Sequence, residues 1–388
     1  MNDPEGELQA LLPRLLRESR IHFLDNLRSF LIVLVILHHA ALPYSALVAV
    51  FWPYKSPYHV WRFSQAIITL FVALNQTFFM GLLFFLAGHF SSIAIERKSY
   101  RAFCVDRLKR LGIPMVVYTL LVHPILLILV EWAHRGSIGS ALKNYYLHLN
   151  GVRGPIWFIA TLLAFDLIYA SIHLIVPSFK YLIPTTQTQY RAAVILGIGA
   201  VIMTSFFLRL SHPIGRTLPP LEVELAYTPQ YVFAYIAGTS MSKTQIWILT
   251  PDPRRALLLS YLGAIAALGI ASLIFGPSAG YAGGWSFVAL FYAVFNEVCF
   301  YFIGRAWYSF FHDSEYTTQR WKNTARYSYG AYLVHSLVVV GLQILVDGAV
   351  GGALDGLFKA IIVGGLAVLG SWALAVVLIS IPFVGRII

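Results

Sequence analysis

Long apolar stretches dominate this sequence and restrict what it can fold into. A helix that crosses a bilayer needs about 20 mostly apolar residues. Stretches of about that length, bounded by proline, glycine or charge, occupy residues 28–48, 66–93, 113–132, 155–176, 192–208, 225–241, 256–275, 285–310, 329–347 and 356–383. The sixth stretch is short and contains Pro229. The sequence therefore predicts an all-α, polytopic membrane bundle of about ten transmembrane helices.

The composition excludes several other classes of protein. Hydrophobic residues make up 58% of the 388 residues and charged residues only 12%, about half the charge of a typical soluble domain. An ordinary soluble enzyme and a disordered chain are both excluded. Two cysteines, Cys104 and Cys299, are too few for a disulfide-stabilised secreted scaffold. The net charge of +11 would suggest nucleic acid in a soluble protein, but these basic residues flank apolar stretches, so we expect no nucleic-acid partner.

The positions of the basic residues predict the orientation. Of the 28 lysines and arginines, 20 fall on the side that carries both termini. The connection between the second and third stretches alone has six, namely Arg97, Lys98, Arg101, Arg107, Lys109 and Arg110. Because loops rich in lysine and arginine stay in the cytoplasm, we expect both termini to be cytoplasmic. The sequence does not separate a bacterial inner membrane, a plasma membrane and the endoplasmic reticulum.

The N-terminal region before the first apolar stretch has its own pattern. Residues 8–20 mix leucines with Arg14, Arg17 and Arg20, which suits a helix lying on the membrane surface; a frayed basic tail is the alternative. The first apolar stretch is too long for a secretory signal and nine more follow it, so we expect it to remain as a spanning helix. We thus divide the chain into a cytoplasmic segment, 1–20, and one transmembrane domain, 21–388.

The first apolar stretch carries the clearest pair of chemically useful residues. Arg28 and His39 are eleven residues apart, so at 100° per residue they lie about 20° apart on a helix, separated by about 16 Å along its axis. His38 falls about 80° away from Arg28. Charged and polar groups in a membrane are costly unless they face the bundle interior or water. The pattern predicts an inward-facing stripe with Arg28 and His39, either functional or as buried packing groups.

A second basic feature precedes the third apolar stretch. Arg107 and Arg110 stand at i and i+3 just before Pro114, and on a regular helix they share one face. Two guanidinium groups at a helix mouth can bind phosphate in a bidentate manner, so a nucleotide-bearing ligand such as coenzyme A is one interpretation. A loop that only sets topology is the other.

The remaining candidates are isolated intramembrane polar groups. Trp157 begins the fourth stretch after Gly154-Pro155, and Asp166, Glu297 and His335 lie inside the fourth, eighth and ninth stretches. Each is a functional candidate because burying an ionisable group in a membrane is costly, although a structural role is common for any one of them. His89, His123 and His173 lack metal-ligand spacing, so we predict no metal site.

Taken in order, these motifs resemble the acyltransferase-3 family of polytopic membrane O-acyltransferases. The matching pieces are Leu24-Asp25-Asn26-Leu27-Arg28 with His38-His39, Phe79 to Gly88, Arg107-x-x-Arg110 running into Ile113-Pro114, Gly154 to Phe158, and Ser328 to His335. They extend from about residue 21 to 385. The chain is most similar to compact stand-alone members such as the glucan-succinylating branch, because it has no appended hydrolase-like domain and has Thr161-Leu162 where a subgroup has a glutamate after Trp157.

The resemblance implies a function and roles for these residues. It implies a cytoplasmic acyl-CoA donor, of acetyl or succinyl type, and an acceptor hydroxyl on a glycan, lipid or small metabolite. Its Arg-x10-His feature falls on Arg28 and His39, and its Arg-x-x-Arg feature on Arg107 and Arg110, which would hold the donor phosphates. Trp157 is a candidate substrate-binding residue.

Our hypothesis for the catalytic residues follows from that implied reaction. His39 would act as general base on the acceptor hydroxyl, Asp25 and Arg28 would orient the donor, and His335 and Glu297 would orient other groups. A secondary transporter is an alternative, but it should show paired halves, and none is visible. A membrane cyclase or isomerase of an apolar metabolite would explain the 15% of aromatic residues.

Overall fold

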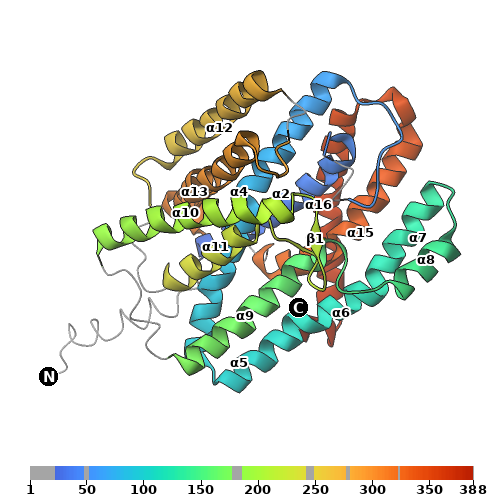
Figure 1. Ribbon diagram of the computed structural model, residues 1–388. Coiled ribbons are helices and arrows are strands. Elements are labelled where there is room, and N and C mark those ends of the chain that lie inside the picture. Colours follow the sequence, from blue (N-terminus) through green and yellow to red (C-terminus); the bar gives the residue numbers. More distant parts are fainter. Residues whose placement is uncertain are drawn as a thin grey trace.

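The computed structural model describes residues 22–47, 52–176, 186–241, 249–276, 280–321 and 324–387. The surface helix expected within residues 8–20 lies outside them. Helices account for 81% of the described chain and strands for very little, so the predicted all-α bundle is confirmed (Figure 1). The long helical segments are α2 (His22–Ala41), α4 (Arg62–Arg97), α5 to α7 (Tyr100–Ala133), α9 (Trp157–Ile175), α10 (Gln187–Ser211), α12 (Pro253–Phe275), α13 (Phe287–Asp313), α15 (Thr324–Val350) and α16 (Gly356–Ser380).

Those nine segments of the described chain are each long and apolar enough to cross a membrane. The remaining predicted stretch, 225–241, contains α11 (Thr228–Met241), which has only 14 described residues. Fourteen residues extend about 21 Å along a helix axis, less than the hydrocarbon thickness of about 30 Å. Pro229 occupies the first turn of α11, where its fixed φ and missing N–H are tolerated, and the helix therefore begins later than the apolar stretch.

The segment from α5 to α7 is one long rod with two local distortions. It passes through α5 (Tyr100–Arg107), the π turn η2 (Leu108–Gly112), α6 (Ile113–Val117), the π turn η3 (Tyr118–Val122) and α7 (His123–Ala133). Each π turn precedes a proline, which removes an N–H and pushes against the carbonyl four residues earlier. The carbonyls freed in this way, at Arg110 and Leu120, accept hydrogen bonds from the hydroxyls of Tyr329 (2.7 Å) and Tyr146 (2.9 Å).

Helix α2 lies inside the bundle and packs against α4, α15 and α16, whereas α12 and the hairpin of α7 with α8 (Ile138–Leu147) lie at opposite edges (Figure 1). Arg28 contacts Ala325 and His39 contacts His335, so α2 and α15 run in the same direction. Helix α16 returns antiparallel to both, and the described ends of the chain share one side of the bundle. We call the side where α2 begins the first side and the other the second side.

Two glycines let α4 and α11 approach closely. A Cβ on Gly88 would lie 2.2 Å from the carbonyl oxygen of Tyr235, and a Cβ on Gly238 would lie 1.9 Å from that of Phe85. Small residues commonly permit backbone contact between membrane helices. Helices α4 and α11 therefore form a tight wall through the middle of the bundle.

Short elements cover the second side. The 3₁₀ turns η1 (Leu42–Tyr44) and η4 (Gly154–Ile156) lie there, with a two-stranded antiparallel hairpin of β1 (Thr217–Leu218) and β2 (Val223–Glu224). The hairpin is tied to the segment before η4, where the N–H of Val152 donates to the carbonyl of Pro220 (2.9 Å). The other short elements are α14 (Glu315–Thr318), η6 (Gly351–Ala353) and α17 (Val384–Ile387).

Candidate active site

Helix α2 presents Arg28 and His39 to the same neighbour, as their spacing predicts. Arg28 pairs with Asp25 at 3.1 Å and donates to the carbonyl of Ala325, at the start of α15, at 3.2 Å. About three turns further along α2, His39 Nδ1 lies 3.0 Å from Nε2 of His335, again on α15. The stripe predicted from the sequence faces the bundle interior and not the lipid.

The hydrogen bonds of the two histidines define which nitrogens carry protons. His335 Nδ1 contacts the carbonyl oxygen of Tyr332, and because a carbonyl can only accept, this nitrogen must be the donor. Neutral His335 then has a bare Nε2, which accepts from Nδ1–H of His39. Neutral His39 is left with a lone pair on Nε2, to which no described residue donates a hydrogen bond. This is the protonation state that a general base requires.

The neighbouring histidine, His38, borders the same cavity as His39 but has different ring contacts. His38 is 5% exposed and packs on the ring of Phe79, with centroids 4.9 Å apart. His38 is therefore a natural comparison for His39 in mutagenesis.

His39 lines a cavity of about 310 Å³ on the second side of the bundle. The cavity lies between α2, α4, η4, α9, α11, α13 and the β hairpin. Its polar and aromatic lining residues include His38, His39, Gln76, Trp157, Thr217, Glu222, Glu224, Tyr227, Tyr231 and Tyr292. Trp157, predicted as a substrate-binding residue, is thus brought into the same cavity as His39, where it stacks on Tyr231 with centroids 5.5 Å apart.

Two carboxylates of the hairpin also line this cavity. Glu222 pairs with Arg153 at 2.5 Å and accepts from the Thr217 hydroxyl at 2.6 Å. Glu224 accepts from the backbone N–H of Gly215 at 3.1 Å. Burial raises the pKa of Glu224 to about 7, although that N–H and Arg209 favour its charged form. Neither residue is predicted from the sequence, because both lie in a connection with no helical periodicity.

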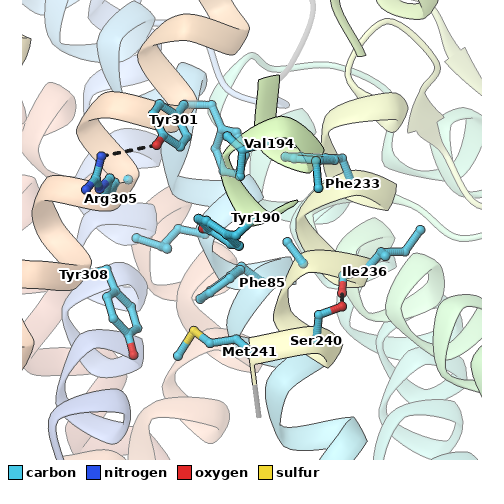
Figure 2. Close-up of a pocket in the computed structure, with 15 residues that line it drawn as sticks. Phe85, Tyr190, Val194, Phe233, Ile236, Ser240, Met241, Tyr301, Arg305 and Tyr308 are labelled. Carbon is cyan, nitrogen blue, oxygen red and sulfur yellow. Dashed lines mark hydrogen bonds between the residues drawn. The ribbon is translucent and has the colours of Figure 1, made fainter. Parts of the chain in front are cut away.

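A second cavity of similar size lies beyond the wall formed by α4 and α11 (Figure 2). It has a volume of about 320 Å³ and is lined mainly by apolar and aromatic residues of α4, α10, α11 and α13. Arg305 borders it, but its guanidinium donates to the Tyr301 hydroxyl (3.2 Å) and to the carbonyl of Leu249 (2.8 Å). None of the predicted catalytic residues lines this cavity, so its size alone does not make it an active site.

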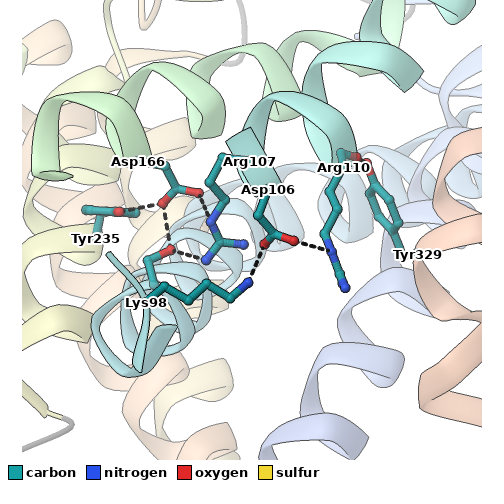
Figure 3. Close-up of polar contacts among 8 residues, drawn as sticks. Lys98, Asp106, Arg107, Arg110, Asp166, Tyr235 and Tyr329 are labelled. Atoms are coloured by element: carbon teal, nitrogen blue, oxygen red, sulfur yellow. Dashed lines mark hydrogen bonds and ion pairs between the residues drawn. The ribbon is translucent and has the colours of Figure 1, made fainter. Parts of the chain in front are cut away.

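The first side of the bundle carries the arginine pair (Figure 3). Arg107 points inward, where Nε pairs with the carboxylate of Asp166 at 3.0 Å and Nη2 donates to Ser91 at 3.1 Å. The other oxygen of that carboxylate accepts from Ser91 and from Tyr235, both at 2.6 Å. This buried network joins α4, α5, α9 and α11.

Arg110 points elsewhere. Its side chain is 55% exposed and pairs with Asp106 at 3.2 Å, whereas the Arg107 side chain is only 17% exposed (Figure 3). The prediction that both arginines share one face is wrong. The reason is the π turn that begins directly after Arg107 and adds a residue to the turn, which rotates Arg110 away from Arg107.

Glu297 lies outside the polar cavity. It is 1% exposed and accepts hydrogen bonds from Gln230 (3.0 Å) and Asn296 (2.9 Å). The structure therefore does not bring this predicted candidate together with His39. Its partners account for its burial without any contact to a substrate.

One face of α15 connects the two sides. Tyr329, Tyr332 and His335 follow at intervals of three residues, and they contact the carbonyl of Arg110, the carbonyl of Pro155 and the ring of His39 respectively. The exposed arginine and the histidine pair are thus linked by successive turns of one helix.

Comparison with known families agrees with this arrangement. The chain matches the family described as an acyltransferase domain, acyltransferase-3, over residues 21–376. No curated protein and no solved structure matches the chain. The match covers most of the chain, and nine segments of the described chain are long and apolar enough to cross a membrane, so the protein is a membrane-bound acyltransferase. The chain belongs to the acyltransferase-3 family. That membership decides against the transporter and cyclase alternatives.

Proposed function

We propose that this membrane acyltransferase moves an acetyl- or succinyl-type group from acyl-CoA to a hydroxyl of a glycan, a lipid or a small metabolite, with His39 as general base. The observation that carries the proposal is that His39 lines a polar cavity while its Nδ1 lies 3.0 Å from Nε2 of His335, an arrangement that leaves its own Nε2 available as a base. His335 is a positioning residue, because its Nε2 accepts the Nδ1–H of His39. A general base in this position contributes about 10²–10⁴-fold to the rate.

The reaction balances with this one base. His39 Nε2 takes the proton of the acceptor hydroxyl while the hydroxyl oxygen attacks the thioester carbonyl carbon. The C–S bond then breaks, and the imidazolium returns the proton to the leaving sulfur, which gives an ester and the free thiol of coenzyme A. A two-step variant, in which His39 first takes the acyl group and then passes it to the acceptor, uses the same nitrogen.

The donor enters from the first side, which we take as cytoplasmic because of its basic residues. Arg110 is exposed there and binds the donor phosphates, whereas Arg107 also shapes the entrance through its pair with Asp166. Arg28, paired with Asp25, lies about three turns before His39 on α2, at the first side of the bundle, and would orient the thioester arm.

The acceptor occupies the cavity on the second side. Carboxylates such as Glu222 and Glu224 accept hydrogen bonds from hydroxyl groups, and Trp157 offers an apolar face to the rest of the acceptor. This lining suits a molecule with several hydroxyl groups, or the polar end of a larger lipid.

The test compares two adjacent histidines. We expect His39→Gln to lower kcat by about 10²–10⁴-fold, measured as acyl transfer per amount of folded protein in membranes. His38→Gln alters the lining of the same cavity but removes a ring that packs on Phe79, so we expect it to change mainly the KM for the acceptor and to keep kcat within about tenfold. Mass spectrometry of host glycans, lipids and metabolites with and without the protein identifies the acylated product. A His39→Gln protein with normal kcat would contradict the proposed base.

The two arginines provide a second test. Arg110→Ala should raise the KM for acyl-CoA with little change in folded yield, because its side chain is exposed. Arg107→Ala should lower the folded yield, because it leaves the buried Asp166 without its ion-pair partner, a change that costs about 3–5 kcal/mol. If the two variants had equal effects on acyl-CoA binding and on folded yield, the buried Arg107 and the exposed Arg110 would not have the different roles proposed here.

A further inference from the structure

A tryptophan outside the helices lies directly on the ring of His39. Trp52 belongs to the connection between α2 and α4 and is 8% exposed. Its ring stacks on the imidazole of His39 with centroids 4.5 Å apart and an angle of 17° between the planes. One face of His39 is therefore covered by an indole, while His335 approaches its edge.

Hydrogen bonds through Gln343 fix this stack. Trp52 Nε1 donates to Oε1 of Gln343 at 2.8 Å, and Nε2 of Gln343 donates to the backbone carbonyl of His39 at 2.9 Å. Because an indole N–H can only donate and a carbonyl can only accept, the orientation of this amide is determined. The indole is thus tied to the same residue on which its ring stacks.

The connection that carries Trp52 is itself anchored in the bundle. The Tyr54 hydroxyl donates to Asp347 at 2.8 Å, and Asp347 pairs with Lys359 at 2.7 Å. The side chains of this ion pair are 3% and 1% exposed. Gln343 and Asp347 are one turn apart on α15, so the same helix holds both Trp52 and the segment behind it.

We propose that Trp52 is a positioning residue for His39, which holds the imidazole against His335 and stabilises the imidazolium that forms when His39 takes the acceptor proton. The inference rests on the proposed function of His39. The face of an indole attracts a cation, and tryptophan is the aromatic side chain that does so most strongly. Because the indole is held in place before the reaction, it stabilises the positive charge without rearrangement.

Substitutions at Trp52 test the proposal by separating kcat from KM. We expect Trp52→Leu to lower kcat about five- to thirtyfold, the range from the strongest exposed cation–π contacts to a desolvated one, with the KM for acyl-CoA within about twofold. Trp52→Phe keeps an aromatic face and should recover most of kcat. The control is Trp307→Leu. Trp307 packs on Phe30 of α2, the helix that also carries His39, but does not contact His39, so its loss should leave kcat within about twofold.

A double variant separates positioning from a general structural effect. In a His39→Gln background, Trp52→Leu should cause no further loss of residual activity, since the indole acts only through the imidazole. If Trp52→Leu lowered the residual activity of His39→Gln by the same factor as it lowers kcat when His39 is intact, the inference would be overturned. A normal kcat in the single variant Trp52→Leu would also overturn it. If His39→Gln itself remains active, the proposed function fails instead, so the two failures can be told apart. Thermal unfolding of each variant reports folding separately.

Discussion

The two cavities have nearly equal volumes, about 310 and 320 Å³, but different chemistry. The cavity on the second side brings together a histidine with a free nitrogen, two carboxylates and several aromatic rings. The cavity across the wall has a mainly apolar lining, and its arginine already has protein partners. Size therefore does not distinguish an active site in this bundle, whereas the convergence of polar groups from several helices does.

The largest expected effect comes from breaking the wall between the cavities. Gly238→Leu would force a side chain into the backbone of α4, because even a Cβ would lie 1.9 Å from the carbonyl oxygen of Phe85. We expect the variant to lose most of its folded protein, measured by size-exclusion chromatography in detergent. Gly263→Leu on α12, where a Cβ meets nothing within 4 Å, is the control and should remain folded.

Blocking each cavity in turn gives the next largest effect. Ala73 lines the polar cavity and Ala237 the apolar one, and both are partly buried. We expect Ala73→Trp to lower acyl transfer by about a hundredfold, because displaced substrate loses its reactive alignment, and Ala237→Trp to change it by less than about threefold. A larger loss of acyl transfer in Ala237→Trp than in Ala73→Trp would show that the substrate binds in the apolar cavity.

The smallest effect concerns the charge of the polar cavity. Burial raises the pKa of Glu224 to about 7 from its ordinary value near 4.5, so its contribution favours the folded state at low pH and is lost as pH rises through 7. Glu224→Gln removes this dependence. We expect the Tm difference between variant and wild type to increase by about 2 °C from pH 5 to pH 8. An unchanged difference would show that Glu224 titrates normally.

Prediction from the sequence succeeded where the determining forces are local. The apolar stretches gave the spanning helices, and the eleven-residue spacing of Arg28 and His39 gave their common face, because hydropathy and helical period act over neighbouring residues. It failed for Arg107 and Arg110, where a π turn before Pro114 changes the local period. The conflict between helix and proline is visible in the sequence, but the way it is relieved depends on the Tyr329 hydroxyl more than 200 residues away.

The sequence by itself determined that this protein spans a membrane many times and that an arginine and a histidine share a face of its first helix. Only the tertiary structure decided that His39 meets His335, that Trp52 covers its ring, and that Glu222 and Glu224 share its cavity whereas Glu297 does not. The reason is physical: burial in a membrane requires a partner for each polar group, but the helix that supplies the partner is chosen by the packing of distant segments.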